Sequence, residues 1–384
     1  MVTGIEQAEQ RVREVLEAQL ARIERIKNEG EPVNYAALDT LRIGLIGGDG
    51  IGPLIMEEAR RVLDTLLADK ISSGQVELVD IKGLTLENRL AAGKALPDDV
   101  LEEIKSCHVL LKGPTTTPEK GDQHGKNIES ANVAMRKALD LFANVRPVRI
   151  PEKNIDWMFF RENTEDAYAV GSQGVDVTED LAIDFKIITS PGTQRIARMA
   201  FEHAKTNGRT RVSAVTKANI IKATDGKFLG ICQEMAKEYP NIAFDSWYID
   251  IMTANLINPK LQSGFQVFVL PNLYGDILTD EAAELQGGVG TAGSANIGTK
   301  YAMFEAIHGS APRMFTEKRE QYADPISILR AAAMMLAHIG YGTEAERLNK
   351  AIDYCTREDS PVKVTGYDDG ATGKEMADYI METL

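Results

Sequence analysis

The sequence has few cysteines, no long apolar run and fewer basic than acidic residues. Its three cysteines, Cys107, Cys232 and Cys355, are far apart and form no CxxC pair, which argues against a disulfide-rich class and favours reduced thiols. The first residues are acidic from Glu6 onward and lack the apolar region of a secretion signal, and no later stretch is apolar for long enough to cross a bilayer. We therefore expect a cytoplasmic protein without a membrane partner.

The negative net charge limits which ligands the protein is expected to bind. Lys and Arg number 43 and Asp and Glu number 57, so the net charge of −14 repels polyphosphate and argues against nucleic acid as a partner. A small polyanionic substrate would need its own dense cluster of arginines and lysines. The 384 residues, of which 43% are hydrophobic, suffice for one large core or for two smaller cores that share a sheet.

Residues 3–28 have the pattern of one polar helix, which a capping box at Thr3-Gly-Ile-Glu6 begins and Gly30 ends. A repeat of about 3.5 residues suits docking or self-association, and a charged extension without a catalytic role is equally compatible. The apolar positions are Ile5, Ala8, Val12, Val15 or Leu16, Leu20, Ile23 and Ile26.

From Leu41 onward short apolar strands alternate with helices, which predicts a parallel or mixed sheet covered on both faces. The expected strands are 42–46, 76–81, 108–111, 158–160, 212–216 and 266–270. The expected helices are 54–68, 98–107, 135–142, 194–206, 228–239, 326–338 and 373–382.

Several segments carry candidate chemistry. The glycine turn at residues 47–53 follows a strand, but it lacks both the GxGxxG spacing and a Walker lysine, so a phosphate loop is not our default interpretation. Asp276 and Asp280 are one helical turn apart, where two carboxylates can share Mg²⁺ or Mn²⁺; a solvated acidic helix start is the alternative. A glycine-dense segment follows at 287–298 and would let the backbone approach a ligand, or would simply be a flexible connection.

Three arginines, Arg136, Arg146 and Arg161, occur near the polar residues Ser130 and Asn132. Guanidinium groups bind carboxylates through two parallel hydrogen bonds, so together they would suit an acidic substrate. Each arginine taken singly is as compatible with a surface ion pair.

These segments occur in a particular order: GGDGIGP, LKGPTTTP, ESANVAMR, NVRP, RENTEDAY, VTKANI, NLYGDILTD, the glycine-dense segment and IHGSAP. From about Leu41 to its end the chain thereby resembles the isocitrate and isopropylmalate dehydrogenase family of metal-dependent decarboxylating dehydrogenases. The resemblance implies an α/β fold with two domains that share a central mixed sheet. A large cofactor-binding domain would comprise residues 41–141 and 288–384, and a small domain residues 142–287, with a dimer clasp at about 166–192. Residues 1–40 would be an N-terminal helical extension.

The resemblance also implies roles for individual residues. Tyr168 and Lys217 would be the catalytic acid and proton relay, and the metal would be held by Asp250, Asp276 and Asp280. Because Lys217 and one aspartate, Asp250, reach the site from a neighbouring subunit in this family, a homodimer or higher homo-oligomer with shared active sites is expected. Substrate would be bound by Ser130, Asn132, Arg136, Arg146, Arg161 and Asn219. The cofactor would be bound by Lys112, Thr116, Thr117, His308, Gly309, Ala311, Arg313, Met314 and Asp324.

The expected substrate is isocitrate, because Ser130 and Asn132 resemble the family's isocitrate pattern, whereas isopropylmalate enzymes have apolar residues there. A homoisocitrate or related 3-substituted malate dehydrogenase is the alternative. A non-catalytic regulatory subunit would have lost catalytic groups that this chain retains. NADP-linked members have a lysine and a tyrosine where this chain has Arg313 and Met314. The arginine could bind a 2′-phosphate, but the tyrosine is missing and the tail at residues 364–373 resembles the NAD-type ending, so we expect NAD rather than NADP. Asp324 departs from a common asparagine.

Overall fold

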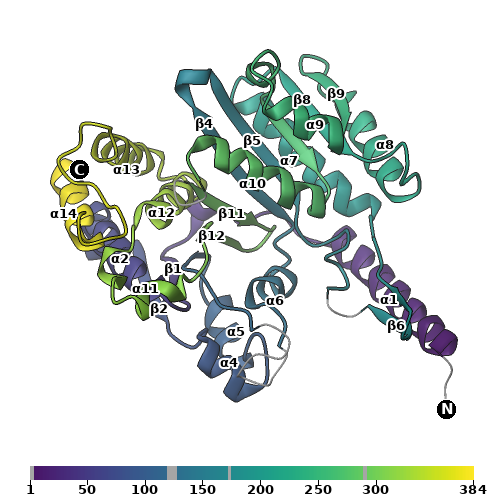
Figure 1. The fold of residues 1–384 in the computed structure, drawn as a ribbon, viewed down its shortest axis with the longest axis horizontal. Helices are drawn as coiled ribbons and strands as arrows, with labels where there is room; N and C mark the ends of the chain where they lie inside the picture. The colour runs from purple at the N-terminus through teal and green to yellow at the C-terminus, as the bar shows by residue number, and fades with distance from the viewer. Residues whose placement is uncertain (1–3, 119–127, 172–173, 289–291) are drawn as a thin grey trace. The chain divides into compact units, whose positions relative to one another are not determined.

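The computed structural model describes residues 4–118, 128–171, 174–288 and 292–384 and confirms the alternation of strands and helices (Figure 1). The chain divides into two compact units. The first unit comprises Met1–Glu31 and Phe142–Gln286, and the second unit comprises Pro32–Leu141 and Gly287–Leu384. Thr3, the expected capping residue of the N-terminal helix, lies outside the described residues.

The second unit has five strands in the order β2-β1-β3-β12-β11, of which the first four are parallel and β11 is antiparallel to β12. Its strands are β1 (Leu41–Ile46), β2 (Val76–Ile81), β3 (Val109–Lys112), β11 (Gly293–Ile297) and β12 (Ala302–Ala306). Its α-helices are α2 (Gly52–Leu66), α3 (Ala68–Ser72), α4 (Leu86–Ala92), α5 (Asp98–Lys105), α6 (Ala131–Ala138), α11 (Pro312–Thr316), α12 (Ile326–His338), α13 (Gly342–Cys355) and α14 (Gly373–Thr383). Short 3₁₀ turns occur at Tyr35–Ala37 and Glu320–Tyr322.

Helices cover both faces of this set of strands because successive strand residues point to opposite sides. On β12, Met303 packs in the core that also contains Ile104 of α5 and Met135 of α6. The next residue, Phe304, meets the ring of His338 on α12 at the other face, with ring centroids 5.4 Å apart. All three cysteines of the chain are buried and free, as expected for reduced core thiols.

Among the described residues of the first unit, five strands follow one another in the order β4-β5-β10-β8-β9, in which β5, β10, β8 and β9 are parallel and β4 is antiparallel to β5. Its strands are β4 (Ala143–Ile150), β5 (Ile155–Glu162), β8 (Arg211–Thr216), β9 (Ala243–Tyr248) and β10 (Val267–Leu270), with β6 (Val175–Thr178) and β7 (Leu181–Ile183) as a separate antiparallel pair. Its α-helices are α1 (Gly4–Lys27), α7 (Ser190–Thr206), α8 (Thr224–Ala236), α9 (Ile249–Leu256) and α10 (Asn272–Gln286). Short 3₁₀ turns occur at Pro151–Lys153 and Gln262–Gly264.

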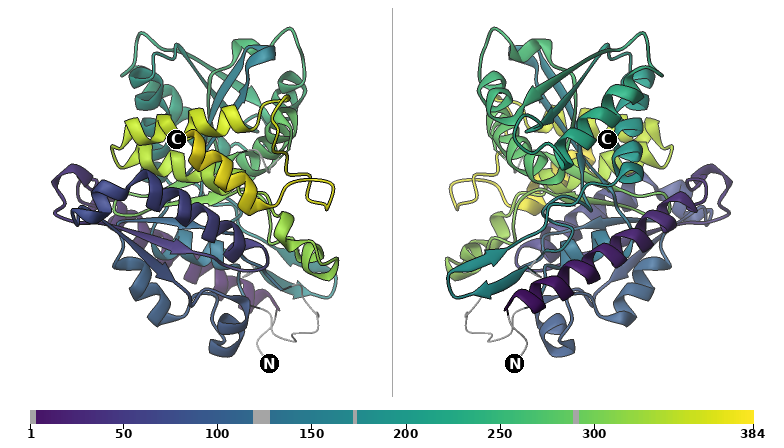
Figure 2. Two further views of the ribbon diagram at one scale, coloured as in Figure 1. Left: turned by 90° about the vertical axis from the view of Figure 1, so that its left-hand side faces the viewer. Right: turned by 90° about the vertical axis from the view of Figure 1, so that its right-hand side faces the viewer.

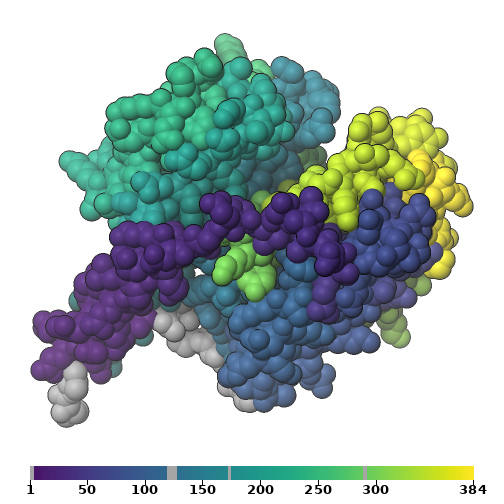
Figure 3. Space-filling view, turned by 180° about the vertical axis from the view of Figure 1, so that it is seen from behind, coloured from purple at the N-terminus to yellow at the C-terminus, as the bar shows by residue number. Residues whose placement is uncertain are grey.

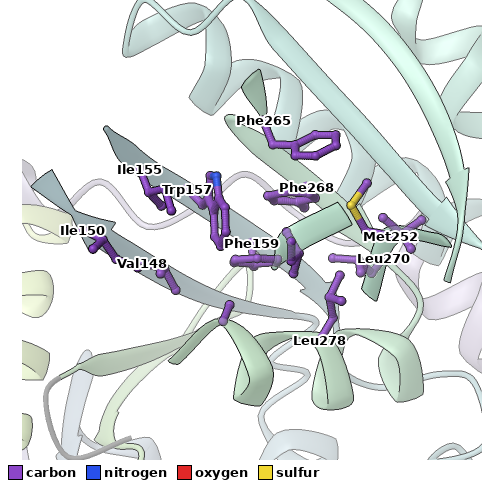
Figure 4. Packing of buried hydrophobic residues seen from close by; sticks show 13 residues of the cluster. Val148, Ile150, Ile155, Trp157, Phe159, Met252, Phe265, Phe268, Leu270 and Leu278 are labelled. Carbon is purple, nitrogen blue, oxygen red and sulfur yellow. The ribbon is translucent and has the colours of Figure 1, made fainter. Parts of the chain in front are cut away.

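An aromatic cluster forms the core between these strands and helices α9 and α10 (Figure 4). Phe159 of β5 stacks on Phe268 of β10 with ring centroids 4.4 Å apart, and Trp157 meets Phe268 edge-on at 6.0 Å. Met252 of α9 and Leu278 of α10 complete the packing. The cluster therefore fixes α10 against the strand that precedes it.

Helix α1 confirms the predicted N-terminal helix, but only part of the predicted apolar positions face inward. Four of the predicted apolar positions, Ile5, Val12, Leu16 and Leu20, are exposed, and one side of the helix is uncovered in Figure 3 (purple). The inward face runs through Gly4, Ala8, Val15 and Arg22, and the helix lies beside β6 (Figure 2, right). A Cβ on Gly4 would lie 1.8 Å from the carbonyl oxygen of Val177, which explains the close approach.

Two sequence predictions of local structure were wrong. The helix expected at 135–142 is α6 at Ala131–Ala138, and β4 begins at Ala143, because Ala143 and Val145 are buried by pairing with β5. The glycine-dense segment contains a buried strand, β11, rather than a loop throughout. A Cβ on Gly293 would lie 2.4 Å from the backbone nitrogen of Ala331, so this glycine allows packing on α12. Residues 289–291 of the segment lie outside the described residues.

The aromatic cluster predicts a large stability effect. We expect Phe268→Ala to lower the free energy of unfolding by about 3–5 kcal/mol, since the fully buried ring leaves a cavity. Leu16→Ala, at a side chain that is 57% exposed, should change it by about 0.5 kcal/mol or less. Both tryptophans, Trp157 and Trp247, belong to the first unit, so denaturant titration followed by tryptophan fluorescence reports on it. Equal effects of the two substitutions would contradict the assigned core.

Candidate active site

Four parallel strands of the first unit end at the same edge of their sheet, and the predicted catalytic residues follow these ends. Arg161 is near the end of β5, Lys217 directly follows β8, Asp250 lies two residues after β9, and α10 begins just after β10. Loops at the carboxyl ends of parallel strands are where α/β proteins bind ligands. The topology therefore gathers residues that are more than 100 positions apart in the sequence.

Asp276 connects two of the predicted residues. Its carboxylate accepts a hydrogen bond from the hydroxyl of Tyr168 at 2.7 Å and forms an ion pair with the guanidinium of Arg161. Arg161 is 1% exposed, and its Nε and Nη2 also donate to the Oδ1 of Asn272, at 2.9 and 2.6 Å. The guanidinium lies 5.3 Å from the Tyr168 ring centroid. Tyr168, Arg161 and Asp276 therefore form one compact group.

Asp280, one helical turn further along α10, forms the corresponding pair with Arg146 of β4. Arg146 Nη1 lies 2.8 Å from both the Asp280 carboxylate and the Thr279 hydroxyl. Two carboxylates and two guanidinium groups thus alternate along the start of α10. Such a group can present oxygen ligands to a cation and nitrogen donors to a carboxylate.

Lys217 and Asp250 form a separate pair, with 2.6 Å between the ammonium nitrogen and a carboxylate oxygen. The hydrogen bond from Lys217 holds the pKa of the Asp250 carboxyl below its usual value. The Lys217 amide donates to the buried Asp225 at 2.7 Å, and Asn219 is exposed in the turn that follows. Within the described ranges no three His, Cys, Asp or Glu side chains are grouped to hold a metal. Asp250, Asp276 and Asp280 therefore do not form such a group within one chain.

In the second unit the predicted substrate residues occur at the start of α6. Ser130 is the residue before the helix, and the Oδ1 of Asn132 accepts a hydrogen bond from Thr115 at 3.1 Å. Arg136 lies one turn further and pairs with Glu305 of β12 at 3.2 Å. Two polar groups and a guanidinium therefore follow one another along α6.

Glu305 is the centre of a buried polar group that the sequence analysis missed. It contacts the fully buried Lys112 at 3.4 Å and accepts a hydrogen bond from Asn296 at 2.7 Å. Burial alone would raise the pKa of Glu305, but the Lys112 ammonium and the Arg136 guanidinium outweigh it and lower the pKa to about 2. Lys112 also donates to the Gly113 carbonyl at 2.9 Å. The Lys112 ammonium thus balances the charge of the buried Glu305 carboxylate. The apolar residues that precede Lys112 in β3 did not indicate this role.

The glycine turn at residues 47–53 holds two other motifs together. Asp49 accepts hydrogen bonds from the amides of Leu86 and Thr116, at 2.6 and 2.8 Å, and pairs with the buried Arg89 at 3.2 Å. Gly48 and Gly50 have φ of +74° and +58°, and added Cβ atoms would lie 2.1 and 2.0 Å from the carbonyl oxygens of Pro114 and Ser310. The turn therefore joins LKGPTTTP to IHGSAP, where the hydroxyls of Thr116 and Ser310 are 2.8 Å apart.

A cavity of about 890 Å³ lies in the second unit beside the IHGSAP segment. Of the predicted cofactor residues, His308, Gly309, Ala311 and Asp324 line it. Three cationic side chains not predicted from the sequence also line it: Arg330, Arg357 and Lys363. Such a cavity has the size and the positive side chains that a phosphate-bearing nucleotide requires.

Four other predicted cofactor residues, Thr116, Thr117, Arg313 and Met314, are not among the lining residues. The Arg313 side chain is 82% exposed and pairs with Glu317 one turn along, at 2.9 Å. Met314 is buried. The guanidinium of Arg313, which was expected to bind the cofactor, thus forms an ion pair with Glu317 in this structure.

Within the described segments, no helix combines the length and the apolar character that crossing a membrane requires.

The fold is that of a known class of enzyme. The model of the isocitrate/isopropylmalate dehydrogenase family matches residues 42–380. Homoisocitrate dehydrogenase of Methanocaldococcus jannaschii is 36% identical over 90% of this chain and 99% of that protein. Isocitrate dehydrogenase [NADP] of Rickettsia prowazekii is 41% identical over 79% of this chain and 61% of that protein. The crystal structure of isocitrate dehydrogenase from Methylococcus capsulatus has a TM-score of 0.77 and 36% identity, covering 90% of this chain and 99% of the other.

The chain belongs to the isocitrate/isopropylmalate dehydrogenase family, and the expected mixed α/β fold class is confirmed. It is therefore an enzyme of a dehydrogenase family, and the Rickettsia relative is named as NADP-linked.

A buried carboxyl group beside this site predicts a pH dependence. Burial and the neighbouring Glu165 raise the pKa of Glu162 from its ordinary value of 4.5 to about 7, although Arg22 of α1, Arg195 of α7 and the Thr164 hydrogen bonds oppose the rise. Between these two pKa values the folded chain binds a proton that the unfolded chain releases. The free energy of unfolding should therefore fall as pH rises through this window.

Glu162→Gln removes this titration and keeps one acceptor oxygen for the Thr164 amide, so the decline between about pH 5 and pH 8 should become shallower. Denaturant titrations at several pH values measure the slope. Glu152→Gln, at an exposed position of the same unit, is the control and should keep the wild-type slope. A Glu162→Gln slope equal to that of the wild type would refute the assignment.

Proposed function

We propose that this protein oxidises isocitrate and removes its β-carboxyl group, giving 2-oxoglutarate and CO₂ with reduction of NAD. The observation that carries the proposal is the group made by Arg161, Tyr168 and Asp276, which unites a carboxylate binder, a proton donor and an oxygen ligand within hydrogen-bond distance. The polar Ser130 and Asn132 favour a substrate with a third carboxylate over one with an apolar substituent.

The side chains have complementary tasks in this proposal. Arg146 and Arg161 would bind substrate carboxylates through paired hydrogen bonds, and the resemblance gives Arg136 of the second unit the same task. Lys217, held by Asp250 at 2.6 Å, would relay the proton of the substrate hydroxyl, releasing one ammonium proton to solvent and taking up the hydroxyl proton in its place. Tyr168 would then donate its proton to the carbon that loses CO₂. The cluster of cationic groups also meets the need set by the negative net charge.

The donors fit a hard divalent cation, Mg²⁺ or Mn²⁺, because Asp276 and Asp280 offer carboxylate oxygens from one face of α10. When bound, the cation would polarise the substrate hydroxyl and the adjacent carboxylate, and the nicotinamide would accept the hydride. Asp250 would complete the ligands from a second subunit, which agrees with its separation from the other two aspartates within one chain. The active unit would then be a homodimer or a higher homo-oligomer.

Homoisocitrate is the second candidate substrate, since one relative of near-complete coverage is a homoisocitrate dehydrogenase. A regulatory subunit is disfavoured by the presence of Tyr168, Lys217 and all three aspartates. NAD is favoured because Met314 stands where NADP-linked members of the family have a tyrosine. NADP is the alternative cofactor.

A direct assay separates these candidates. Purified protein with Mn²⁺ and either NAD or NADP is given isocitrate or homoisocitrate, and the absorbance of the reduced nicotinamide is followed. We expect kcat/KM for isocitrate to exceed that for homoisocitrate by about 10-fold or more, the discrimination typical of one methylene group. Faster turnover of homoisocitrate would assign the second candidate. The absence of turnover with both cofactors and both substrates would indicate a non-catalytic chain.

The metal assignment is tested with Asp276→Asn, which keeps one oxygen for hydrogen bonding but removes the charge. We expect turnover to fall by about 10²-fold or more, because an electrostatic contact to the reacting group is lost. The stabilisation by Mn²⁺ seen in thermal unfolding should also weaken, and the metal-free protein should unfold at a lower temperature because the buried Arg161 loses its compensating charge. Asp369→Asn, at an exposed acidic position, is the control. Unchanged turnover at saturating Mn²⁺ would count against Asp276 as a ligand.

A further inference from the structure

Arg22 of the N-terminal helix reaches a segment that carries two proposed active-site residues. The helix lies outside the residues that the family model matches, and its role is open from sequence alone. Arg22 is 9% exposed although it is a charged residue on a surface helix. Its Nη1 donates to the Oε1 of Glu165, and its Nη2 donates to the hydroxyl of Thr164, each at 2.6 Å. One guanidinium thus holds two successive residues through two donors.

These two residues lie between Arg161 and Tyr168 in the RENTEDAY segment. Thr164 links Arg22 to Glu162, because its hydroxyl donates to the Glu162 carboxylate at 2.6 Å and its amide donates to the same carboxylate. The Glu165 amide also donates to Glu162 at 2.6 Å. Glu162 directly follows Arg161, so the hydrogen bonds from Arg22 reach the residue next to the substrate-binding arginine in two steps.

The same segment is joined to α10 on its other side. The Asn272 side chain donates to the Glu165 carbonyl at 3.4 Å, and the Leu273 amide donates to Asp166 at 2.9 Å. Asp166 has a left-handed φ of 67°, a conformation that costs free energy for a residue other than glycine and that these contacts support. Residues 162–166 are therefore held between Arg22 of α1 and the beginning of α10, where Asp276 lies.

The charges explain why an arginine is required. Glu162 and Glu165 are both completely buried, and two carboxylates so close repel each other in a medium of low polarity. Arg22 and Arg195 are the cations that lower the pKa of Glu162 against this effect. Thr189 gives Glu165 two neutral donors: its amide donates to the Glu165 carboxylate at 2.9 Å, and its hydroxyl donates to the same carboxylate. Without Arg22, one of the two carboxylates would have to take up a proton or move towards solvent.

We propose that Arg22 is a positioning residue, which fixes the segment between Arg161 and Tyr168 and thereby links the N-terminal helix to the reaction. This inference rests on the proposed function for its kinetic consequence only. Displacement of the segment would misplace both the carboxylate-binding guanidinium of Arg161 and the phenol of Tyr168. Small misplacements of catalytic groups lower rates strongly.

The test compares Arg22→Met with Arg25→Met, which removes an exposed arginine one turn further along the same helix. We expect Arg22→Met to lower kcat/KM for isocitrate by about 10- to 100-fold, with kcat reduced as well as KM raised, and Arg25→Met to stay within about 2-fold of wild type. Arg22→Lys keeps the charge but cannot bridge both partners in the same geometry, so it should recover only part of the loss. A loss equal in Arg25→Met would overturn the proposal.

Hydrogen–deuterium exchange of the full-length protein supplies a readout that does not depend on turnover. In Arg22→Met, amides of residues 161–168 should exchange faster than in wild type, whereas Arg25→Met should leave them unchanged. If these amides are unaffected, or if they exchange faster while kcat/KM stays at the wild-type value, Arg22 is not a positioning residue. If the wild-type protein itself does not oxidise isocitrate, the proposed function fails while the exchange result still decides the structural part.

The double variant Arg22→Met/Glu165→Gln guards against a folding defect, because it removes the uncompensated buried charge together with the arginine. It should recover stability more than activity. Full recovery of kcat/KM in the double variant would show that Arg22 acts only by balancing charge, and would overturn a positioning role. The decline of stability with pH should also extend to higher pH in Arg22→Met, since the folded-state pKa of Glu162 rises when one of its two lowering cations is removed.

Discussion

The ion pair between Arg161 and Asp276 is the interaction on which the first unit's site depends. A buried guanidinium requires a compensating charge and a full set of acceptors, which Asp276 and Asn272 supply from the first two turns of α10. Since Asp276 also accepts the Tyr168 hydrogen bond, the pair fixes where a proton donor and an oxygen ligand lie relative to each other. The aromatic cluster packs against α10 and fixes the position of the helix relative to β10. Core packing and site chemistry are therefore coupled through a single helix.

Both units bring oppositely charged side chains together, but the two groups differ in their exposure to solvent. Each collects acidic and basic side chains at the carboxyl ends of parallel strands, where backbone groups and loops are available to bind ligands. In the first unit the charged groups alternate along α10 and are partly open to solvent. In the second unit Lys112, Glu305 and Arg136 form a buried network that holds β3, β12 and α6 together. The first arrangement suits ligand exchange, and the second suits a rigid support.

The N-terminal helix extends this logic beyond the part of the chain that defines the family. Its exposed apolar residues made it resemble a docking segment, yet its inward face carries an arginine and not a hydrophobic stripe. Arg22 lies outside the residues that the family model matches, yet it holds the RENTEDAY segment in position without any change in that segment's own sequence. This offers one route by which a member of the family can stabilise a segment that contains two buried carboxylates.

The sequence by itself determined the fold class, most strands and helices and the family, because strand and helix periodicities are local and nine motifs occur in a fixed order. Strand 76–81 and helix 326–338 have the predicted bounds, and the strand predicted at 212–216 begins one residue earlier, at Arg211. Only the tertiary structure decided which charges meet: Glu305 with Lys112, Asp49 with Thr116 and Arg89, and Arg22 with Glu165. These partners are separated by 40 to 193 positions, and no local pattern encodes their pairing. The inward face of α1 was likewise decided by the surface that it covers, since Val15 and Arg22 are buried whereas Leu16 and Leu20 of the predicted apolar repeat are exposed.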